Sequence, residues 1–345
     1  MRISPTAVPL RGGLSLCFAA VAIMAEALPV AAAQPCPNPP PAVRDLDIPR
    51  FYSDAAGSKV DPRLKAANEA AVAPLVAFLR EVTAEADAAL RSTKVEKRQE
   101  TARCALSWLE AWARGGAWLG RVDQQGEAQR KWDLTGTALA YVKVKPYATP
   151  EQRKVIETWL LKVAGAARAY FDDPGRKRNN HWYWLGLGLA GVAIATGDER
   201  QWATARDIAR DAARDIRDDG ALPMELARAE RALHYHAFAV MPLVVLAEIA
   251  RARGEDFYAF NDGALHRLVA LTVRGLDDPA VFEKLSSVRQ ALVPSTPGVA
   301  WLPLYRRHFS AALGGNLPSM KTADRRFGGD ALLLIEMLAA GRKGR

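Results

Sequence analysis

Histidine and cysteine are scarce in this chain, which has five and three of them among 345 residues. It contains no H-E-x-x-H motif and no Cys/His cluster with zinc-ligand spacing. His234 and His236 are two positions apart, so on a helix they would point to different sides. We therefore predict neither a metal site nor a cofactor.

Proline and glycine, at 21 and 25 residues, are too few for a collagen-like or linker-dominated chain. Half of the residues are hydrophobic, which excludes a disordered chain. Long hydrophobic runs are also missing, because charged residues interrupt every apolar stretch beyond the N-terminus. The sequence therefore predicts a folded chain without a membrane span.

The N-terminus has the pattern of a signal peptide. Arg2 and Arg11 precede an apolar run over 14–25 that is too short to span a membrane, and the small residues 31–33 follow it. We predict a cleavable signal peptide over 1–33, with an N-terminal membrane anchor as the alternative. A periplasmic or secreted location follows from cleavage.

Export also affects which cysteines remain in the chain and whether they can form a disulfide. Cys17 would leave with the signal peptide, and Cys36 and Cys104 would remain as an even pair in an oxidising compartment. We predict a disulfide between these two residues that ties the proline-rich lead-in to the rest of the domain. Two free buried thiols are the alternative.

The formal net charge is +9, which suits nucleic acid, a membrane surface or an acidic polymer equally well. Lysine and arginine are mixed with aspartate and glutamate along most of the chain, a pattern typical of solvated helix faces. We therefore predict no nucleic-acid partner. The one short basic cluster is Arg176-Lys177-Arg178, directly before two asparagines and a histidine.

Helical periodicity dominates the chain, and no alternating strand pattern of useful length is present. Short loops between helices favour antiparallel pairs, and the absence of a strict repeat argues against a regular solenoid. The predicted fold is all-α, a bundle or toroid of helical hairpins, in a single domain over 34–345. Helices are expected from 62 through at least 82, and over 104–118, 132–144, 150–170, 181–196, 199–218, 231–252, 262–275, 299–313 and 330–341.

Residues 186–191 match the dinucleotide-binding pattern G-x-G-x-x-G. That pattern requires a strand before it and a helix after it, whereas here one helical pattern continues through all three glycines. We therefore interpret the glycines as sites of close helix–helix packing.

Two segments concentrate polar and aromatic side chains. Residues 178–184 place two asparagines, a histidine and three aromatic residues at an expected helix start. Residues 223–236 contain Arg228, Arg231, two histidines and Tyr235. Taken alone, each segment is equally compatible with a capped helix packed on the core.

Together these segments resemble the periplasmic alginate (polymannuronate) lyases of polysaccharide lyase family 5. The resemblance extends over nearly the whole chain after the signal peptide, in separated motifs that occur in the family's order. It implies an incomplete α/α toroid, or barrel, of antiparallel hairpins with a substrate cleft, and β-elimination of a polyuronate. The motifs are residues 104–108, 111–114, 130–132, 179–181, 223–236 and 326–330.

The resemblance also implies roles for individual residues. Asn180 and Arg228 would neutralise the substrate carboxylate, because an amide and a guanidinium suit that planar group. His181 and Tyr235 match the family's acid/base pair. We expect substrate contacts from Lys59, Lys131, Trp132, Arg178, Trp184 and Arg326.

One segment departs from the family. Alginate-specific members carry a lysine a few residues before a Gly-Ser pair, where this chain has Asp54 before Gly57-Ser58, and its nearest lysine is Lys59. We therefore expect a lyase for polymannuronate that also accepts polyglucuronate. We also expect the protein to be a monomer. The alternatives are a glycoside hydrolase using Glu225 and Glu230, and a non-catalytic periplasmic polysaccharide-binding or export protein.

Overall fold

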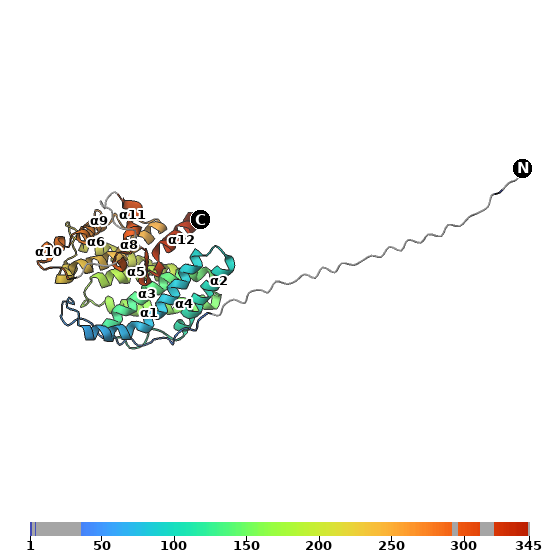
Figure 1. Ribbon diagram of the computed structural model, residues 1–345, viewed down its shortest axis with the longest axis horizontal. Helices are drawn as coiled ribbons and strands as arrows, with labels where there is room; N and C mark the ends of the chain where they lie inside the picture. Colours follow the sequence, from blue (N-terminus) through green and yellow to red (C-terminus); the bar gives the residue numbers. More distant parts are fainter. Residues whose placement is uncertain (2–3, 5–35, 292–295, 311–320, 344–345) are drawn as a thin grey trace. The chain divides into compact units, whose positions relative to one another are not determined.

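The computed structural model describes residues 36–291, 296–310 and 321–343, together with Met1 and Ser4. It divides into the units Met1–Pro35 and Cys36–Arg345, and the second unit holds all secondary structure of the described residues (Figure 1). The apolar run and the cleavage site of the predicted signal peptide lie outside the described residues, so that signal peptide stays a prediction.

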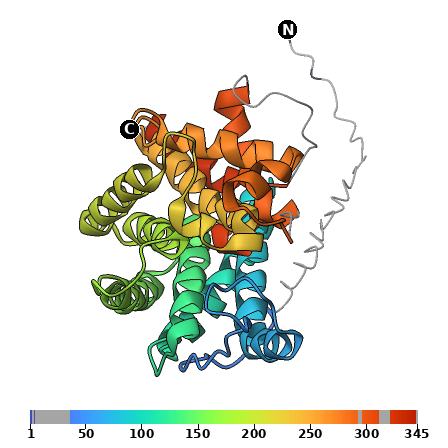
Figure 2. The same ribbon diagram turned by 90° about the vertical axis from the view of Figure 1, so that its left-hand side faces the viewer.

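The long helices alternate between inner and outer positions, and the predicted all-α class is confirmed. Each inner helix packs against the next inner helix, while an outer helix packs beside it. Figure 2 shows these helices following one another around an arc from blue to orange. The inner helices are α1 (Pro62–Arg91), α3 (Gln124–Val144), α5 (Asn180–Thr196) and α8 (Ala232–Arg253), and the outer ones are α2 (Val95–Arg114), α4 (Pro150–Phe171), α6 (Glu199–Asp215) and α9 (Ala264–Asp277).

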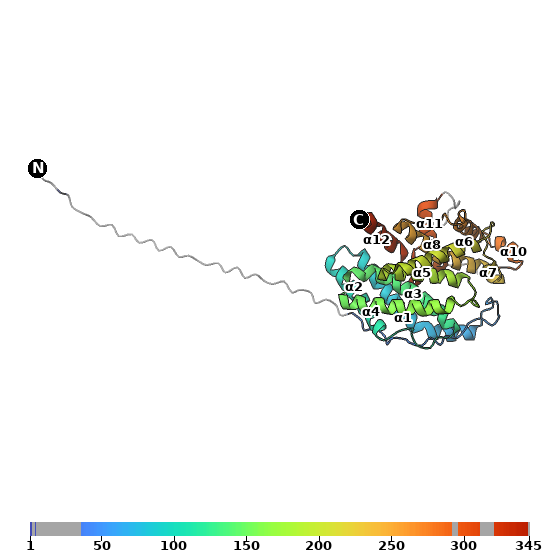
Figure 3. The ribbon, with the colours of Figure 1, turned by 180° about the vertical axis from the view of Figure 1, so that it is seen from behind.

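Shorter elements connect and close this arrangement. α10 (Ala280–Ser286) and α2 lie at opposite ends of the unit, as the view from behind also shows (Figure 3). β1 (Ala323–Asp324) and β2 (Gly329–Asp330) pair antiparallel around η5 (Arg325–Phe327). The remaining elements are η1 (Lys145–Tyr147), α7 (Pro223–Leu226), η2 (Ala229–Arg231), η3 (Thr296–Val299), α11 (Leu302–Phe309) and α12 (Ala331–Lys343).

Helix boundaries follow local capping chemistry. Asp61 accepts hydrogen bonds from the first backbone N–H groups of α1, and Pro62 opens that helix. Thr149 and Gln152 form a capping box at the start of α4. Gly197, which directly follows the predicted helix end at 196, ends α5 in the left-handed conformation.

Some boundaries differ from the prediction. Trp118 does not continue the helix of Cys104, because α2 ends at Arg114 and Trp118 lies in the following loop with a φ of 63°. α3 begins at Gln124 rather than Trp132, because the Asp123 carboxylate accepts from the Gly126 N–H and caps the earlier turn. Residues 311–313, the end of one expected helix, lie outside the described residues.

The glycines of the dinucleotide-like pattern lie inside α5, where they permit close packing. A Cβ on Gly186 would lie 2.8 Å from Ile208 Cγ2 of α6, and one on Gly188 would lie 2.8 Å from Thr135 Oγ1 of α3. The interpretation as packing glycines is therefore confirmed. Within the described residues, 229–253 is the one segment long and apolar enough to cross a membrane, and 89% of its most apolar part is buried in the core.

The segment before α1 is extended and bound to α2. The predicted disulfide is confirmed, since Cys36 is bonded to Cys104 of α2. Farther along, Trp108 Nε1 donates to the Pro37 carbonyl and Trp112 Nε1 donates to the Pro40 carbonyl. The indole donors of α2 thereby satisfy carbonyl groups of a segment that has few backbone partners of its own.

Replacing both cysteines by alanine should lower the free energy of unfolding. The bond closes a loop with a sequence separation of 68 residues, which corresponds to about 4 kcal/mol in the chain-entropy model. Urea unfolding of the wild type and of the Cys36→Ala/Cys104→Ala variant measures the difference. An unchanged midpoint and slope would show that the bond does not constrain the unfolded chain.

Candidate active site

A cleft of about 1300 Å³ opens on the inner helices. Its wall is formed by the segment before α1, by α3, by the start of α5, by the stretch from α7 to α8, and by η5. Asn180, His181, Arg228 and Tyr235, the four predicted catalytic residues, all line it. Positions that are widely separated in the sequence therefore meet in one site.

Positive charge predominates in the cleft lining, which has seven arginine and lysine residues against two acidic ones. This excess attracts a polyanion and repels a cation. The basic residues are Arg50, Arg176, Lys177, Arg228, Arg231, Arg325 and Arg326, and the acidic residues are Glu69 and Asp123.

Tyr235 lies near the start of α8 and is almost completely buried. Its phenolic oxygen is 2.6 Å from the phenolic oxygen of Tyr52, and the Arg228 guanidinium lies 3.6 Å from its ring centroid. Burial, followed by the interaction with Tyr52, raises the pKa of Tyr235 far above its usual range. At neutral pH Tyr235 is therefore a neutral phenol, while Arg228 favours its ionised form.

Sequence reasoning missed Tyr52. It adjoins Phe51 in the N-terminal segment, where only the missing lysine was considered. The residues next to Tyr52 in the sequence do not indicate that it contacts Tyr235, which lies 183 positions later. The aromatic pair in an otherwise polar loop was the available signal.

His181 lies at the start of α5, stacked on Trp132 with ring centroids 5.6 Å apart. Burial lowers the pKa of His181 well below 6.5, and the nearby positive charges of Lys131 and Arg228 add to this shift. The imidazole is therefore neutral at neutral pH. Its Nδ1 atom is buried and has no hydrogen-bond partner in the protein. A neutral imidazole of this kind can accept a proton.

Asn180 is held in place by Glu225 of α7. Both the backbone N–H and the side-chain Nδ2 of Asn180 donate to Glu225 Oε1, at 2.8 and 2.9 Å. Both side chains are almost completely shielded from solvent. Because the backbone N–H and the side-chain Nδ2 both end at Oε1, which accepts from them, this oxygen fixes which end of the amide faces Glu225. Glu225 is thus an anchor for Asn180, and neither it nor Glu230 lines the cleft.

Arg228 follows α7 and connects the cleft to the N-terminal segment. Its Nη2 donates to the Gly57 carbonyl at 3.0 Å. Gly57 has a φ of +66°, and a Cβ there would lie 2.6 Å from Nη2 of Arg228. Glycine at this position therefore allows both the left-handed turn and the close approach of the guanidinium.

Of the six predicted substrate-binding residues, Trp132 and Arg326 line the cleft. Arg326 donates through Nε and Nη2 to the two oxygens of Asp324, at 3.0 and 2.8 Å, and lies over the ring of Phe238. This bidentate pairing fixes the direction of the guanidinium. The positions of these two residues are compatible with the predicted contacts.

The other four do not line the cleft, which corrects the predicted arrangement. Lys131 is completely buried, and its Nζ donates to the Ala128 carbonyl and lies 3.8 Å from the Trp132 ring centroid. Trp184 is buried behind Arg326. Arg178 is exposed and lies over the Trp182 ring, and Lys59 is exposed as well. α3 and α5 are buried on nearly all sides, so their sequence does not reveal which face lines the cleft.

Asp54, near the position of the family's lysine, is not part of the cleft lining, and its carboxylate binds its own loop. It accepts hydrogen bonds from the backbone N–H groups of Ser58 and Lys59 and from the Ser58 hydroxyl. Desolvation acts to raise the pKa of Asp54, but these hydrogen bonds outweigh it and lower the pKa to about 2. The carboxylate therefore stabilises the turn that holds Gly57 against Arg228.

The cleft is also lined by polar residues that the sequence analysis did not assign to it. They include Gln129, Arg231, His234 and Arg325. His234 has a pKa lowered to about 4 by burial and by the nearby arginines, so it is neutral as well. His236, in contrast, is a buried structural residue whose Nε2 accepts from the Leu222 N–H. In the part of the chain that the structure describes, no three His, Cys, Asp or Glu residues are grouped to hold a metal ion.

Comparison with known proteins shows to which family this chain belongs. The alginate lyase family model matches residues 46–282. The chain belongs to the alginate lyase family. A polysaccharide lyase of Stenotrophomonas maltophilia strain K279a is 40% identical over 307 residues, which cover 83% of this chain and 91% of that protein. An alginate lyase of Pseudomonas fluorescens strain Pf-5 is 35% identical over 225 residues, or 62% of this chain and 61% of that enzyme.

Solved structures of this family share the fold. Alginate lyase A1-III of Sphingomonas species A1 has a TM-score of 0.73 at 26% identity, covering 87% of this chain and 85% of that one. A tyrosine-to-phenylalanine variant of A1-III, complexed with a tetrasaccharide, has a TM-score of 0.76 at 25% identity, with the same coverage. The α/α toroid implied by the family resemblance is thereby confirmed.

Exchange of Glu225 for leucine should impair the site, because it removes the oxygen that accepts from both donors of Asn180. Without this acceptor the Asn180 amide is free to turn. We expect a loss in kcat of about 100-fold, as for removal of one positioned donor. The matched control is Glu230→Leu, five residues away and outside the cleft lining, which should retain wild-type kcat. Equal activities of the two variants would contradict the anchoring role.

Proposed function

We propose that this chain is a polysaccharide lyase that cleaves alginate, chiefly its polymannuronate, by β-elimination and leaves a C4–C5 unsaturated uronate end. The observation that carries the proposal is the set of Asn180, His181, Arg228 and Tyr235 in one cationic cleft. The S. maltophilia relative, named a polysaccharide lyase and matched over 91% of its length, supports the reaction class.

The reaction sets clear demands on the site. The C5 proton of a uronate is weakly acidic while the adjacent C6 carboxylate is ionised. Donors that neutralise this carboxylate stabilise the aci-anion that forms when the proton leaves. We assign this role to the Asn180 amide and the Arg228 guanidinium. The Glu225 anchor and the Gly57 contact hold both groups before substrate binds.

Proton transfer is assigned to Tyr235 and His181. In mannuronate the C5 proton and the O4 leaving group lie on the same face, so one phenolic oxygen can remove the proton and then protonate O4. Because Tyr235 is a neutral phenol at neutral pH, it must first release its proton to solvent in the substrate complex, and the Arg228 and Arg231 guanidiniums favour that ionisation. Neutral His181 assists, or acts as the base where the proton lies on the opposite face.

The alternative functions have less support. A glycoside hydrolase needs two carboxylates on either side of the scissile bond, whereas Glu225 is buried against Asn180 and Glu230 lies outside the cleft lining. A binding or export protein does not require a neutral histidine and a buried tyrosine beside carboxylate-binding donors. We further propose a periplasmic or secreted monomer with a cleaved signal peptide and no cofactor.

Removal of the phenolic oxygen tests the assignment of Tyr235. Tyr235→Phe should lower kcat at least 100-fold on polymannuronate, because a proton-transfer group contributes 10²–10⁴-fold, while binding of the polymer persists. The absorbance of the new C4–C5 double bond reports turnover. His234→Asn, a change in the neighbouring cleft residue, is the control and should lose far less kcat. A Tyr235→Phe variant with more than about a tenth of wild-type kcat would remove Tyr235 from this role.

Substrate range is the second test of the proposal. Mannuronate and glucuronate share their configuration at C4 and C5 and differ at C2, and discrimination by one hydroxyl is weak unless buried polar groups are left unpaired. We expect measurable kcat/KM on both polymers and the lowest value on polyguluronate, whose C5 proton lies on the other face. The three homopolymers are compared at equal chain length and ionic strength. A preference for polyguluronate would contradict the assignment of Tyr235 as the base.

A further inference from the structure

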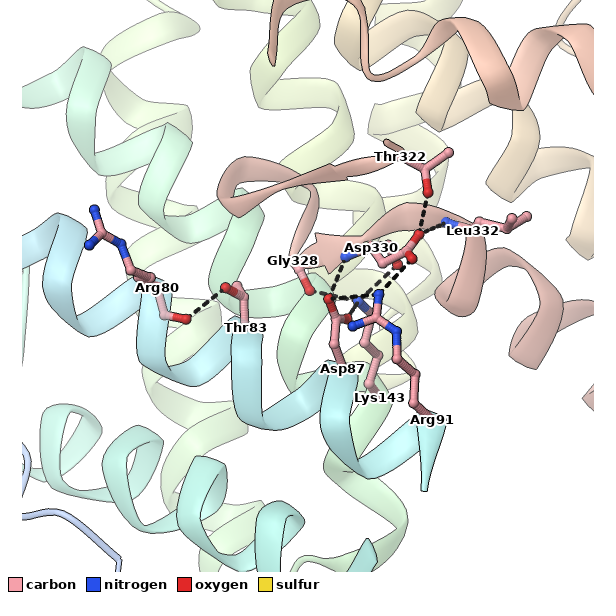
Figure 4. Close-up of polar contacts among 9 residues, drawn as sticks. All are labelled: Arg80, Thr83, Asp87, Arg91, Lys143, Thr322, Gly328, Asp330 and Leu332. Atoms are coloured by element: carbon pink, nitrogen blue, oxygen red, sulfur yellow. Dashed lines mark hydrogen bonds and ion pairs between the residues drawn. The ribbon is translucent and has the colours of Figure 1, made fainter. Parts of the chain in front are cut away.

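A short C-terminal segment brings two arginines to the cleft. We call residues 321–330 the C-terminal strap. It contains β1, η5 and β2, and its residues Arg325 and Arg326 line the cleft. The strap packs on α1 and α3, far from it in sequence (Figure 4). The position of both guanidiniums therefore depends on how the strap is attached to these helices.

The attachment centres on a buried ion pair between two inner helices. Lys143 of α3 is completely shielded from solvent, and its Nζ donates to Asp87 Oδ1 of α1. The same ammonium donates to the carbonyls of Gly328 and Asp330, at 2.7 and 3.0 Å. The other oxygen of Asp87 accepts from the Asp330 N–H at 2.8 Å. Three of these four hydrogen bonds thus reach the strap backbone just after Arg326.

The Asp330 side chain ties together both ends of the strap. Its carboxylate accepts hydrogen bonds from the Thr322 hydroxyl, from Arg91 Nη2 of α1 and from the Leu332 N–H (Figure 4). The strap is therefore fixed at residues 322 and 330, with Arg325 and Arg326 between these points.

Small residues let the strap lie directly on the helices. A Cβ on Gly328 would lie 2.6 Å from the Ala140 nitrogen of α3, and one on Gly329 would lie 2.5 Å from Asp87 Oδ2. On the helix side, a Cβ on Gly136 would lie 2.3 Å from the Arg325 carbonyl. Gly136, Ala140 and Lys143 share one face of α3, so this face is shaped to receive the strap.

A buried ion pair is a costly way to stabilise a core, since apolar side chains of similar volume often serve as well or better. The hydrogen bonds of this pair, however, fix the orientation of the strap backbone, which apolar packing would not do. We propose that Lys143 and Asp87 are positioning residues for substrate binding, which act by holding the strap so that Arg325 and Arg326 face the carboxylates of the bound polymer. This inference rests on the proposed function.

The test removes the ion pair without leaving an unpaired charge. Lys143→Met/Asp87→Leu exchanges both residues for apolar ones of similar size. We expect the KM for polymannuronate to rise about tenfold, the effect of losing one charge-assisted contact, with kcat changed less than about threefold. Arg325→Ala/Arg326→Ala should raise KM at least as much, and combining it with the pair exchange should add little, because the pair acts through these two guanidiniums.

A control separates positioning from stability. Leu160→Ala creates a cavity in α4, which packs on α2, α3 and α5, and should lower Tm while leaving KM unchanged. Wild-type KM in the pair variant, or multiplicative effects with Arg325→Ala/Arg326→Ala, would overturn the positioning role. A wild type that forms no unsaturated product would instead overturn the proposed function. In that case the affinity of the same variants for polymannuronate would be measured. Equal Kd values for the wild type and the pair variant would overturn the inference.

Discussion

Repulsion between like charges is the constraint on which this cleft depends. Arginines from four distant parts of the chain line one cavity, and nothing in the lining neutralises most of them. Neighbouring polar groups hold these arginines in place instead. Asp324 pairs with Arg326, the Gly57 carbonyl accepts from Arg228, and the Asp87–Lys143 pair fixes the strap. The cationic surface is thereby fixed before a polyanion arrives, which reduces the reorganisation that binding requires.

The surrounding structure also sets the protonation states of the two residues that are proposed to transfer protons. Burial next to cations keeps His181 neutral, and burial keeps Tyr235 protonated while Arg228 lies against its ring. Two of the inner helices, α5 and α8, supply this dry environment, because they are apolar on nearly every side and begin at the cleft. The outer helices, with one apolar face each, shield them from solvent.

Much of this architecture could be predicted from the sequence. Helical periodicity is a local signal, so it located most helices within a few residues. The four residues proposed to be catalytic were found through family motifs. Contacts between distant segments could not be predicted: Tyr52 meets Tyr235, and Glu225 holds Asn180. Lys131 and Trp184 were placed in the cleft because a helix buried all round gives no sign of which face is open.

The central claim is that Asn180 and Arg228 together receive the carboxylate whose neighbouring proton is removed. A crystal structure of the Tyr235→Phe variant with a mannuronate tetramer tests it most directly. The account predicts one C6 carboxylate within hydrogen-bond distance of both Asn180 Nδ2 and the Arg228 guanidinium, with the C5 hydrogen directed at the ring of residue 235. A carboxylate bound only by Arg325 and Arg326, with C5 turned away from residue 235, would contradict it.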